Sequence, residues 1–163
     1  MSHVIQLAPP SADHHAPAGD APGPVVRTDA VHVVFTSVDD TLAAVRVAAG
    51  IARAMGVPLK VVHFRVVPHP MAVDAPFGVS PIETDEFRER VRAEGVEARV
   101  RVYLCRHERR AIPMAFKRRS IVVLAGRRRR WPTTAERLRR RLEAAGHYVV
   151  FVDASDHQED SRA

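Results

Sequence analysis

The segment 120–152 constrains the fold more than any other stretch, because it reads as strand, glycine, helix and strand in succession. Residues 121–125 (IVVLA) are a short, continuous apolar run rich in β-branched side chains. Such a run is typical of a strand that is buried on both faces of a parallel sheet. Gly126 ends the run, a helix is predicted at 133–145, and a second apolar strand is predicted at 147–152.

Local signals define both ends of the predicted helix. Thr133 and Glu136 have the spacing of a capping box, in which each side chain satisfies a backbone N–H at the helix start. Gly146 follows the last turn, where a residue in the left-handed conformation commonly ends a helix. A strand, a glycine turn and a helix N-terminus in this order form an anion-receiving geometry in α/β sheets, so we expect the function of the chain here.

The rest of the chain continues the alternation of strands and helices. Apolar periodicity predicts three more strands, at 31–37, 59–67 and 96–105. It also predicts three more helices, at 41–55, 84–94 and 109–118. With short connections and right-handed crossovers, this α/β pattern gives a single doubly wound, five-stranded parallel sheet with helices on both faces.

The order of the strands follows from the pattern of the third one. Residues 96–105 alternate between apolar and polar side chains, which predicts a half-exposed strand at a sheet edge. The strand order is then 3-2-1-4-5, counted along the chain. In such a sheet a ligand lies at the switch between the first and fourth strands, beyond their carboxyl ends.

Length and composition predict one folded domain at 30–153, since 163 residues are enough for one domain with a substantial core. Residues 1–29 hold five prolines and no periodicity, which predicts a disordered arm. Residues 154–163 are predicted to be a flexible tail. The long connection at 68–81 is interpreted as either a lid or a simple insertion.

The sequence predicts a cytoplasmic protein from its apolar runs, its N-terminus and its cysteine content. Apolar residues make up 46% of the chain, but no run of 18 or more occurs, so no membrane segment is predicted. The N-terminus lacks the apolar region of a secretory signal. A single cysteine, Cys105, excludes an internal disulfide and fits a reducing compartment.

The chain is arginine-rich, and its formal net charge is +6. Positive charge is concentrated at 106–141, including the run Arg127–Arg130. This run is either a solvated basic loop or an anion site for a nucleotide phosphate, a nucleic-acid backbone or an acidic partner. Nucleic acid is not favoured, because Trp131 alone gives little support for base stacking.

Several catalytic patterns are excluded by what surrounds their candidate residues. Asp39 and Asp40 resemble the acid pair of two-component receiver domains, but the Asp, Thr or Ser, and Lys that should end later strands are missing. The two aspartates are therefore interpreted as helix caps. His63 lies within an apolar strand and is interpreted as a core histidine. No nucleophile–base pair and no metal-ligand spacing occurs in the sequence, so we expect neither an enzyme nor a metal site.

Over residues 30–153 the sequence resembles the universal stress protein (UspA-like) family. Ala44, Ala48, Ala52, Gly56, Leu59 and His63-Phe64 match the alanine-spaced first helix and the second strand of that family. The stretch SIVVLAG resembles the family pattern DLIVMG, and TTAERL resembles the start of the family's last helix. The resemblance implies the fold of the adenine nucleotide alpha hydrolase-like proteins.

Nucleotide-binding members of that family hold ATP with three devices, and this sequence departs from each. Thr36 stands where those members have an aspartate after the first strand. Gly126 supplies the first glycine of their G-x-x-G-x9-G-(S/T) loop, but Arg129 occupies the second glycine position. Thr133 or Thr134 replaces the final hydroxyl after a shortened loop. The resemblance therefore implies a divergent, non-hydrolytic member without a conventional ATP cofactor.

Two functions follow from these observations. The first is a non-enzymatic stress-response or regulatory module that forms a homodimer through the last strand, at Tyr148, Val149, Val150 and Phe151. The alternative is a module that binds an adenine nucleotide or another anion, including an acidic partner. Its predicted site residues are Thr36, Ser37, Phe64, Gly126, Arg127, Arg129, Arg130, Thr133 and Thr134.

Overall fold

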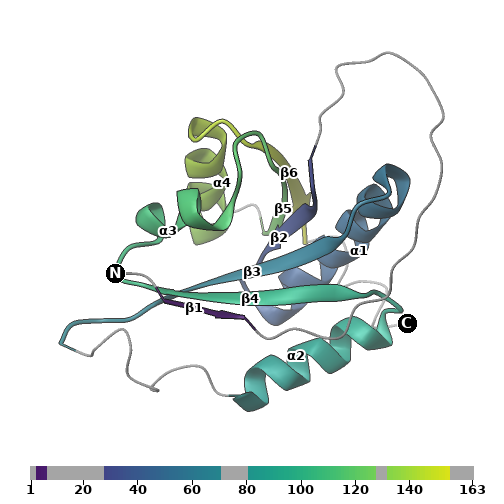
Figure 1. Ribbon diagram of the computed structural model, residues 1–163, viewed down its shortest axis with the longest axis horizontal. Coiled ribbons are helices and arrows are strands. Elements are labelled where there is room, and N and C mark those ends of the chain that lie inside the picture. Colours follow the sequence, from purple (N-terminus) through teal and green to yellow (C-terminus); the bar gives the residue numbers. More distant parts are fainter. Residues whose placement is uncertain (1–2, 7–27, 71–80, 128–131, 155–163) are drawn as a thin grey trace.

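The computed structural model describes residues 3–6, 28–70, 81–127 and 132–154, which form one six-stranded sheet covered by helices (Figure 1). The strands are β1 (His3–Gln6), β2 (Val31–Val34), β3 (Leu59–Val66), β4 (Ala98–Cys105), β5 (Ile121–Gly126) and β6 (Tyr148–Asp153). The helices are α1 (Val38–Met55), α2 (Pro81–Ala93), α3 (Glu108–Ala115) and α4 (Thr134–Ala144).

The sheet has the order β1-β4-β3-β2-β5-β6. Strands β2 to β6 are parallel to one another, and β2 pairs with both β3 and β5. Counted without β1, this is the predicted five-stranded parallel sheet of order 3-2-1-4-5. The switch in strand order lies between β2 and β5, as predicted.

Strand β1 corrects two predictions. Residues 3–6 pair antiparallel with β4, in a register that places Gln6 opposite Arg101. The disordered-arm interpretation of 1–29 is therefore wrong for these four residues, whereas 1–2 and 7–27 lie outside the described residues. The edge position of the 96–105 strand is also wrong, because β1 pairs with the outer side of β4. Four residues are too few for an alternating pattern to stand out from a proline-rich surrounding sequence.

Helices cover both faces of the sheet (Figure 1), and a cluster of buried apolar side chains lies beneath the helices on each face. On one face, α1 and α2 pack against residues of β2, β3, β4 and β5, with Val45, Ala48, Phe87, Val61 and Val123 among the buried side chains. On the other face, α3 and α4 pack through Ile112, Phe116, Leu138 and Leu142. Different helices cover the two faces of the sheet. Clefts can therefore form at the ends of the strands, between the helices of the two faces.

Helix α1 begins earlier than the predicted 41–55. Ser37 is its N-cap, and the hydroxyl oxygen accepts a hydrogen bond from the Asp40 N–H at 3.2 Å. Asp39 and Asp40 lie in the first turn, so the interpretation of these aspartates as caps is wrong. They still lie where carboxylates favour the helix dipole.

The bounds of α2 and α3 also differ from prediction. Helix α2 begins at Pro81 rather than 84, because proline fits the first turn, where its missing N–H has no helical partner. Helix α3 ends at Ala115 rather than 118, two residues after Pro113. Its C-cap residue, Phe116, leaves the helix and is buried in the core.

Helix α4 shows half of the predicted capping box. The Thr133 hydroxyl oxygen accepts a hydrogen bond from the Glu136 N–H at 3.2 Å. The Glu136 carboxylate instead accepts a hydrogen bond from Arg139 at 3.2 Å. Gly146 has φ +83°, as the predicted left-handed helix end requires.

The predicted tail and the predicted lid are described only at their margins. Of residues 154–163, the structure describes Ala154, which is buried and donates its N–H to the Gly126 carbonyl oxygen at 3.3 Å. Of the connection 68–81, positions 71–80 lie outside the described residues. Neither the lid nor the insertion interpretation is therefore tested.

Candidate functional site

A cleft of about 370 Å³ lies at the carboxyl ends of β2 and β5, where the N-termini of α1 and α4 meet. Parallel strands on either side of a switch in strand order leave such a crevice, because their following helices cover opposite faces. The lining residues are Thr36, Ser37, Asp39, Asp40, Gly126, Arg127, Thr133, Thr134 and Ala135. Six of the nine predicted site residues are thus brought together.

The hydroxyl groups of this cleft hold the backbone around it. The Thr36 hydroxyl donates to the Ala125 carbonyl oxygen at 3.1 Å, which ties the end of β2 to β5. The Thr36 N–H donates to the Thr41 hydroxyl oxygen at 3.1 Å. Together with the caps at Ser37 and Thr133, these bonds fix two helix N-termini towards one space.

Gly126 is required by helix packing at this position. A Cβ added there would lie 2.6 Å from the Ala135 Cβ and 3.4 Å from the Phe151 ring. Strand β5 and helix α4 therefore approach each other closely only because residue 126 has no side chain. The glycine that we predicted as part of a phosphate loop therefore has a structural reason at this position.

The other predicted site residues lie elsewhere. Phe64 belongs to the apolar core beneath α3 and α4, where its ring centroid lies 5.9 Å from those of Tyr103 and Phe116. Arg129 and Arg130 lie outside the described residues. Phe64 was predicted to be a site residue, but adjacent residues of a strand point to opposite faces, and its neighbour His63 lies on the face with the aromatic pocket.

An aromatic pocket of about 380 Å³ adjoins the cleft, and Ser37 lines both. The ring centroid of Phe35 lies 4.4 Å from that of His63 and 5.3 Å from that of Phe87. His63 is therefore half-buried in a pocket wall, and the interpretation as a core histidine is correct only in part. The sequence does not reveal this pocket because Phe87 comes from α2, far along the chain.

An ion pair between exposed side chains connects α1 and α2 beside the two cavities. Arg90 donates a hydrogen bond to the Asp39 carboxylate at 3.0 Å. This pairing offsets one of the two carboxylates that face the cleft at the N-terminus of α1. The cleft can therefore accept an anion at the two helix ends with less repulsion than its sequence indicates.

Strand β6, the predicted dimer edge, pairs only with β5 among the described strands. The N–H groups of Tyr148 and Ala154 donate to the carbonyl oxygens of Ser120, just before β5, and Gly126, at its end. Because the direction alternates along a strand, the N–H groups of Val149 and Phe151 point away from β5. Tyr148 and Val150 are 39% and 36% exposed. The strand thus presents open backbone groups and apolar side chains together.

The chain has one thiol, and its surroundings lower its acidity. Cys105 is buried, and burial, followed by the nearby Glu108 carboxylate, raises the pKa of the thiol. Within the described part of the chain, no group of three His, Cys, Asp or Glu side chains is arranged to hold a metal ion. None of the described helices combines the length and apolar character needed to cross a membrane.

Comparisons with known proteins agree with the fold. No protein-family model and no curated protein matches the sequence. The structure is similar to that of a universal stress protein from Archaeoglobus fulgidus, with a TM-score of 0.55, 20% identity, and coverage of 77% of this chain and 94% of that chain. It is also similar to the universal stress protein from Archaeoglobus fulgidus in complex with dAMP, with a TM-score of 0.50, 21% identity, and coverage of 79% and 100%. The five parallel strands, their order and these similarities together identify the fold of this chain as that of the universal stress proteins.

Proposed function

We propose that this chain is a non-enzymatic regulatory module of the universal-stress-protein type, which acts as a homodimer paired through β6. The observation that carries the proposal is the edge of β6, which has no second partner strand within the described part of the chain and carries exposed apolar side chains. Strand edges of this kind pair readily with another strand. An antiparallel pair of β6 strands about a two-fold axis joins two sheets and satisfies both edges at once.

The polar groups at the carboxyl end of the sheet support a regulatory rather than a catalytic role. The Ser37 and Thr133 hydroxyls accept backbone hydrogen bonds as helix caps, and the Thr36 hydroxyl ties β2 to β5. Burial raises the pKa of the Cys105 thiol. The three hydroxyls maintain the shape of the cleft, as a module that responds to a ligand requires.

The dimer is tested with Val150→Glu. We expect wild-type protein at high micromolar concentration to have the mass of two chains by light scattering. The dissociation constant of the dimer is expected to rise at least about tenfold in the variant, because each copy then brings a negative charge to the apolar edge that the two strands share. Val47→Glu, which adds the same charge at an exposed valine of α1, is the matched control and leaves the mass unchanged. A wild-type mass of one chain at that concentration would refute the dimer.

A second candidate function is the binding of an adenine nucleotide across the cleft and the aromatic pocket. The observation in its favour is that Ser37, at the N-terminus of α1, lines both cavities. In this proposal the base stacks among Phe35, His63 and Phe87, and the phosphate lies at the helix ends with Arg127. Arg129, Arg130 and Thr134 complete the proposed set. The similar structure that holds dAMP supports the choice of ligand class.

Nucleotide binding is tested by calorimetry with AMP and ATP at two salt concentrations. Phe35→Leu is expected to weaken AMP binding about tenfold, because a base that stacks on an aromatic ring loses that contact. Phe64→Leu makes the same change on the opposite face of the sheet, so it is the control and leaves AMP affinity unchanged. Heat of binding that is absent for both nucleotides, or that vanishes at high salt, would exclude a folded nucleotide site.

A further inference from the structure

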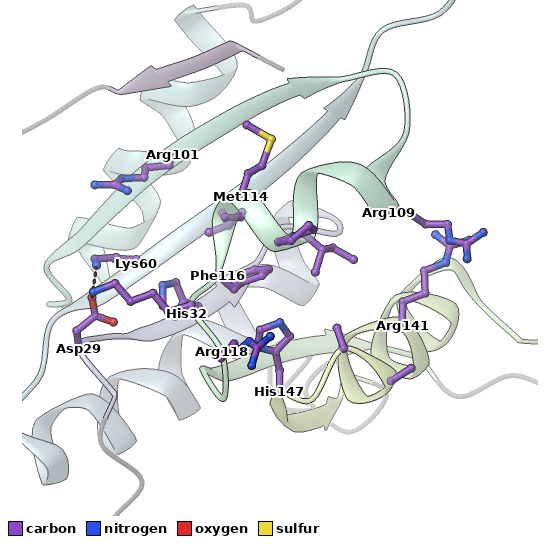
Figure 2. A pocket seen from close by; sticks show the side chains of 17 residues that line it. Asp29, His32, Lys60, Arg101, Arg109, Met114, Phe116, Arg118, Arg141 and His147 are labelled. Atoms are coloured by element: carbon purple, nitrogen blue, oxygen red, sulfur yellow. Dashed lines mark ion pairs between the residues drawn. The ribbon is translucent and has the colours of Figure 1, made fainter. Parts of the chain in front are cut away.

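A further cavity lies at the other end of the sheet, near the amino ends of the parallel strands. It measures about 1040 Å³ and opens between the sheet, α3 and the last turn of α4 (Figure 2). His32 and Lys60 are the second residues of β2 and β3, and His147 directly precedes β6. This cavity is therefore separate from the clefts at the carboxyl ends.

Two buried histidines form its inner wall. His32 is 4% exposed and His147 is 9% exposed. Their ring centroids lie 5.2 and 5.5 Å from that of Phe116, so one phenyl ring has an imidazole on each of two sides (Figure 2). Apolar residues of the sheet and α3, Val62 and Ile112, complete the floor.

Three polar atoms in this cavity have no hydrogen-bond partner within the described chain. They are Nδ1 of His32, Nδ1 of His147 and Nε of Arg101, and all three are buried. His32 also has a hydrogen bond with the backbone of Ile121, so Nδ1 is its remaining polar atom. Buried polar atoms are normally paired, and three unpaired atoms in one cavity indicate a partner that the described residues do not supply.

Positive charge gathers around the same cavity. Six cationic side chains line it: Lys60, Arg101, Arg109, Lys117, Arg118 and Arg141. Asp29 is the carboxylate of the described lining and pairs with Lys117 at 2.9 Å and Lys60 at 3.9 Å. Glu108, outside the lining, pairs with Arg141 at 2.8 Å. Six cations against two carboxylates leave the cavity strongly positive.

We propose that this cavity binds a phosphorylated organic molecule. Its phosphate is held by the guanidinium and ammonium groups of Arg101 and Lys60, and its organic part contacts Phe116 and hydrogen-bonds to Nδ1 of His32 and His147. Figure 2 shows Lys60 and Arg101 on one side of His32, and Arg118 also lines the cavity. Phosphate suits this setting because it offers several oxygens to guanidinium groups that converge from different elements, whereas one carboxylate pairs fully with a single arginine.

The shape of the site favours a small molecule over a nucleic-acid strand. The unpartnered atoms of His32 and His147 are buried inside the cavity, beyond the reach of a backbone that follows the surface. The volume is that of a site for one nucleotide-sized ligand. Because the cavity lies at the opposite end of the strands from the proposed nucleotide clefts, the proposal does not depend on them.

The site is tested with two organic phosphates. Ribose 5-phosphate carries hydroxyl donors, phenyl phosphate carries an apolar ring, and inorganic phosphate is the reference. NMR of the imidazole nitrogens is recorded during titration of the full chain at fixed ionic strength. We expect saturable shifts of His32 and His147 Nδ1 and tighter binding of at least one organic phosphate than of inorganic phosphate. Arg101→Gln is expected to weaken that binding about tenfold.

Two further variants keep the test decisive. Lys60→Gln should weaken binding in the same direction if Arg101→Gln does not fold. Arg53→Gln removes the same charge from the last turn of α1, on the other face, and should leave affinity unchanged. The proposal is overturned if the histidine signals do not respond to either probe, if inorganic phosphate binds as tightly as both, or if Arg53→Gln weakens binding as much as Arg101→Gln.

Discussion

Lowering the pH from 6.5 to 4 is expected to reduce the free energy of unfolding by about 3 kcal/mol through His32. Burial, followed by the positive charge of Lys60, lowers the pKa of His32 from 6.5 to about 4. Between these values the unfolded chain binds a proton that the native imidazole does not. Stability therefore falls as the pH falls through this window, and the loss is complete once the native His32 is also protonated.

The charges that face His32 come from several elements. Arg101 of β4 also lowers its pKa, whereas Asp29 and the hydrogen bond with the backbone of Ile121 raise it. Burial lowers the pKa of His147 as well, so this second imidazole adds a loss in the same direction. Acid thus acts on both histidines that contact Phe116.

Urea unfolding at a series of pH values measures this effect. His32→Leu is expected to flatten the dependence between pH 6.5 and 4, because the variant has no imidazole to protonate at this position. His107→Gln removes an exposed histidine at the N-cap of α3 and should retain the wild-type slope. Equal slopes for the wild type and His32→Leu would show that this histidine does not control acid stability.

Gly126→Ala is expected to destabilise the protein by about 1–3 kcal/mol. The new methyl group would lie 2.6 Å from the Ala135 Cβ, on the first turn of α4, and neither backbone can move without loss of packing. The strain falls on the element that carries the Thr133 cap. Denaturant unfolding of the variant measures the loss directly.

A double-mutant cycle identifies the cause. Ala135→Gly removes the opposing methyl group, so Gly126→Ala should cost much less in that background, although glycine within α4 itself costs about 1 kcal/mol. Gly50→Ala is the control, because nothing lies within 4 Å of its added Cβ, and it should stabilise α1 slightly. Additive effects of the substitutions at 126 and 135 would contradict the packing explanation.

The succession of parallel strands and helices was predictable because its signals are local. The apolar run at 121–125, the alternation at 96–105 and the glycines at 56 and 146 each act within a few residues. The position of Phe64 was not predictable in the same way. The alternation of side chains along a strand predicts that His63 and Phe64 lie on opposite faces of the sheet. Which face carries a cleft is decided only by the packing of the helices.

The amino-end cavity depends on packing even more strongly. Its histidines are separated by more than a hundred positions in the sequence, and each alone reads as an ordinary apolar-strand or turn residue. Phe116 brings them together because α3 ends early and turns this ring into the core. Local periodicity carries no information about contacts between residues so far apart in the sequence. The Thr133 cap, in contrast, was predictable from the residues of the first helical turn that follows it.

The short strand β1 has a consequence for assembly. It pairs with part of the outer edge of β4, and its four residues offer only a short edge to another strand, whereas β6 has no second partner among the described strands. A molecule with one open strand edge can pair with one other molecule and forms a dimer. A molecule with two open edges can add further copies at both sides and forms a ribbon. A few residues at the start of the chain thereby limit the risk of fibre formation.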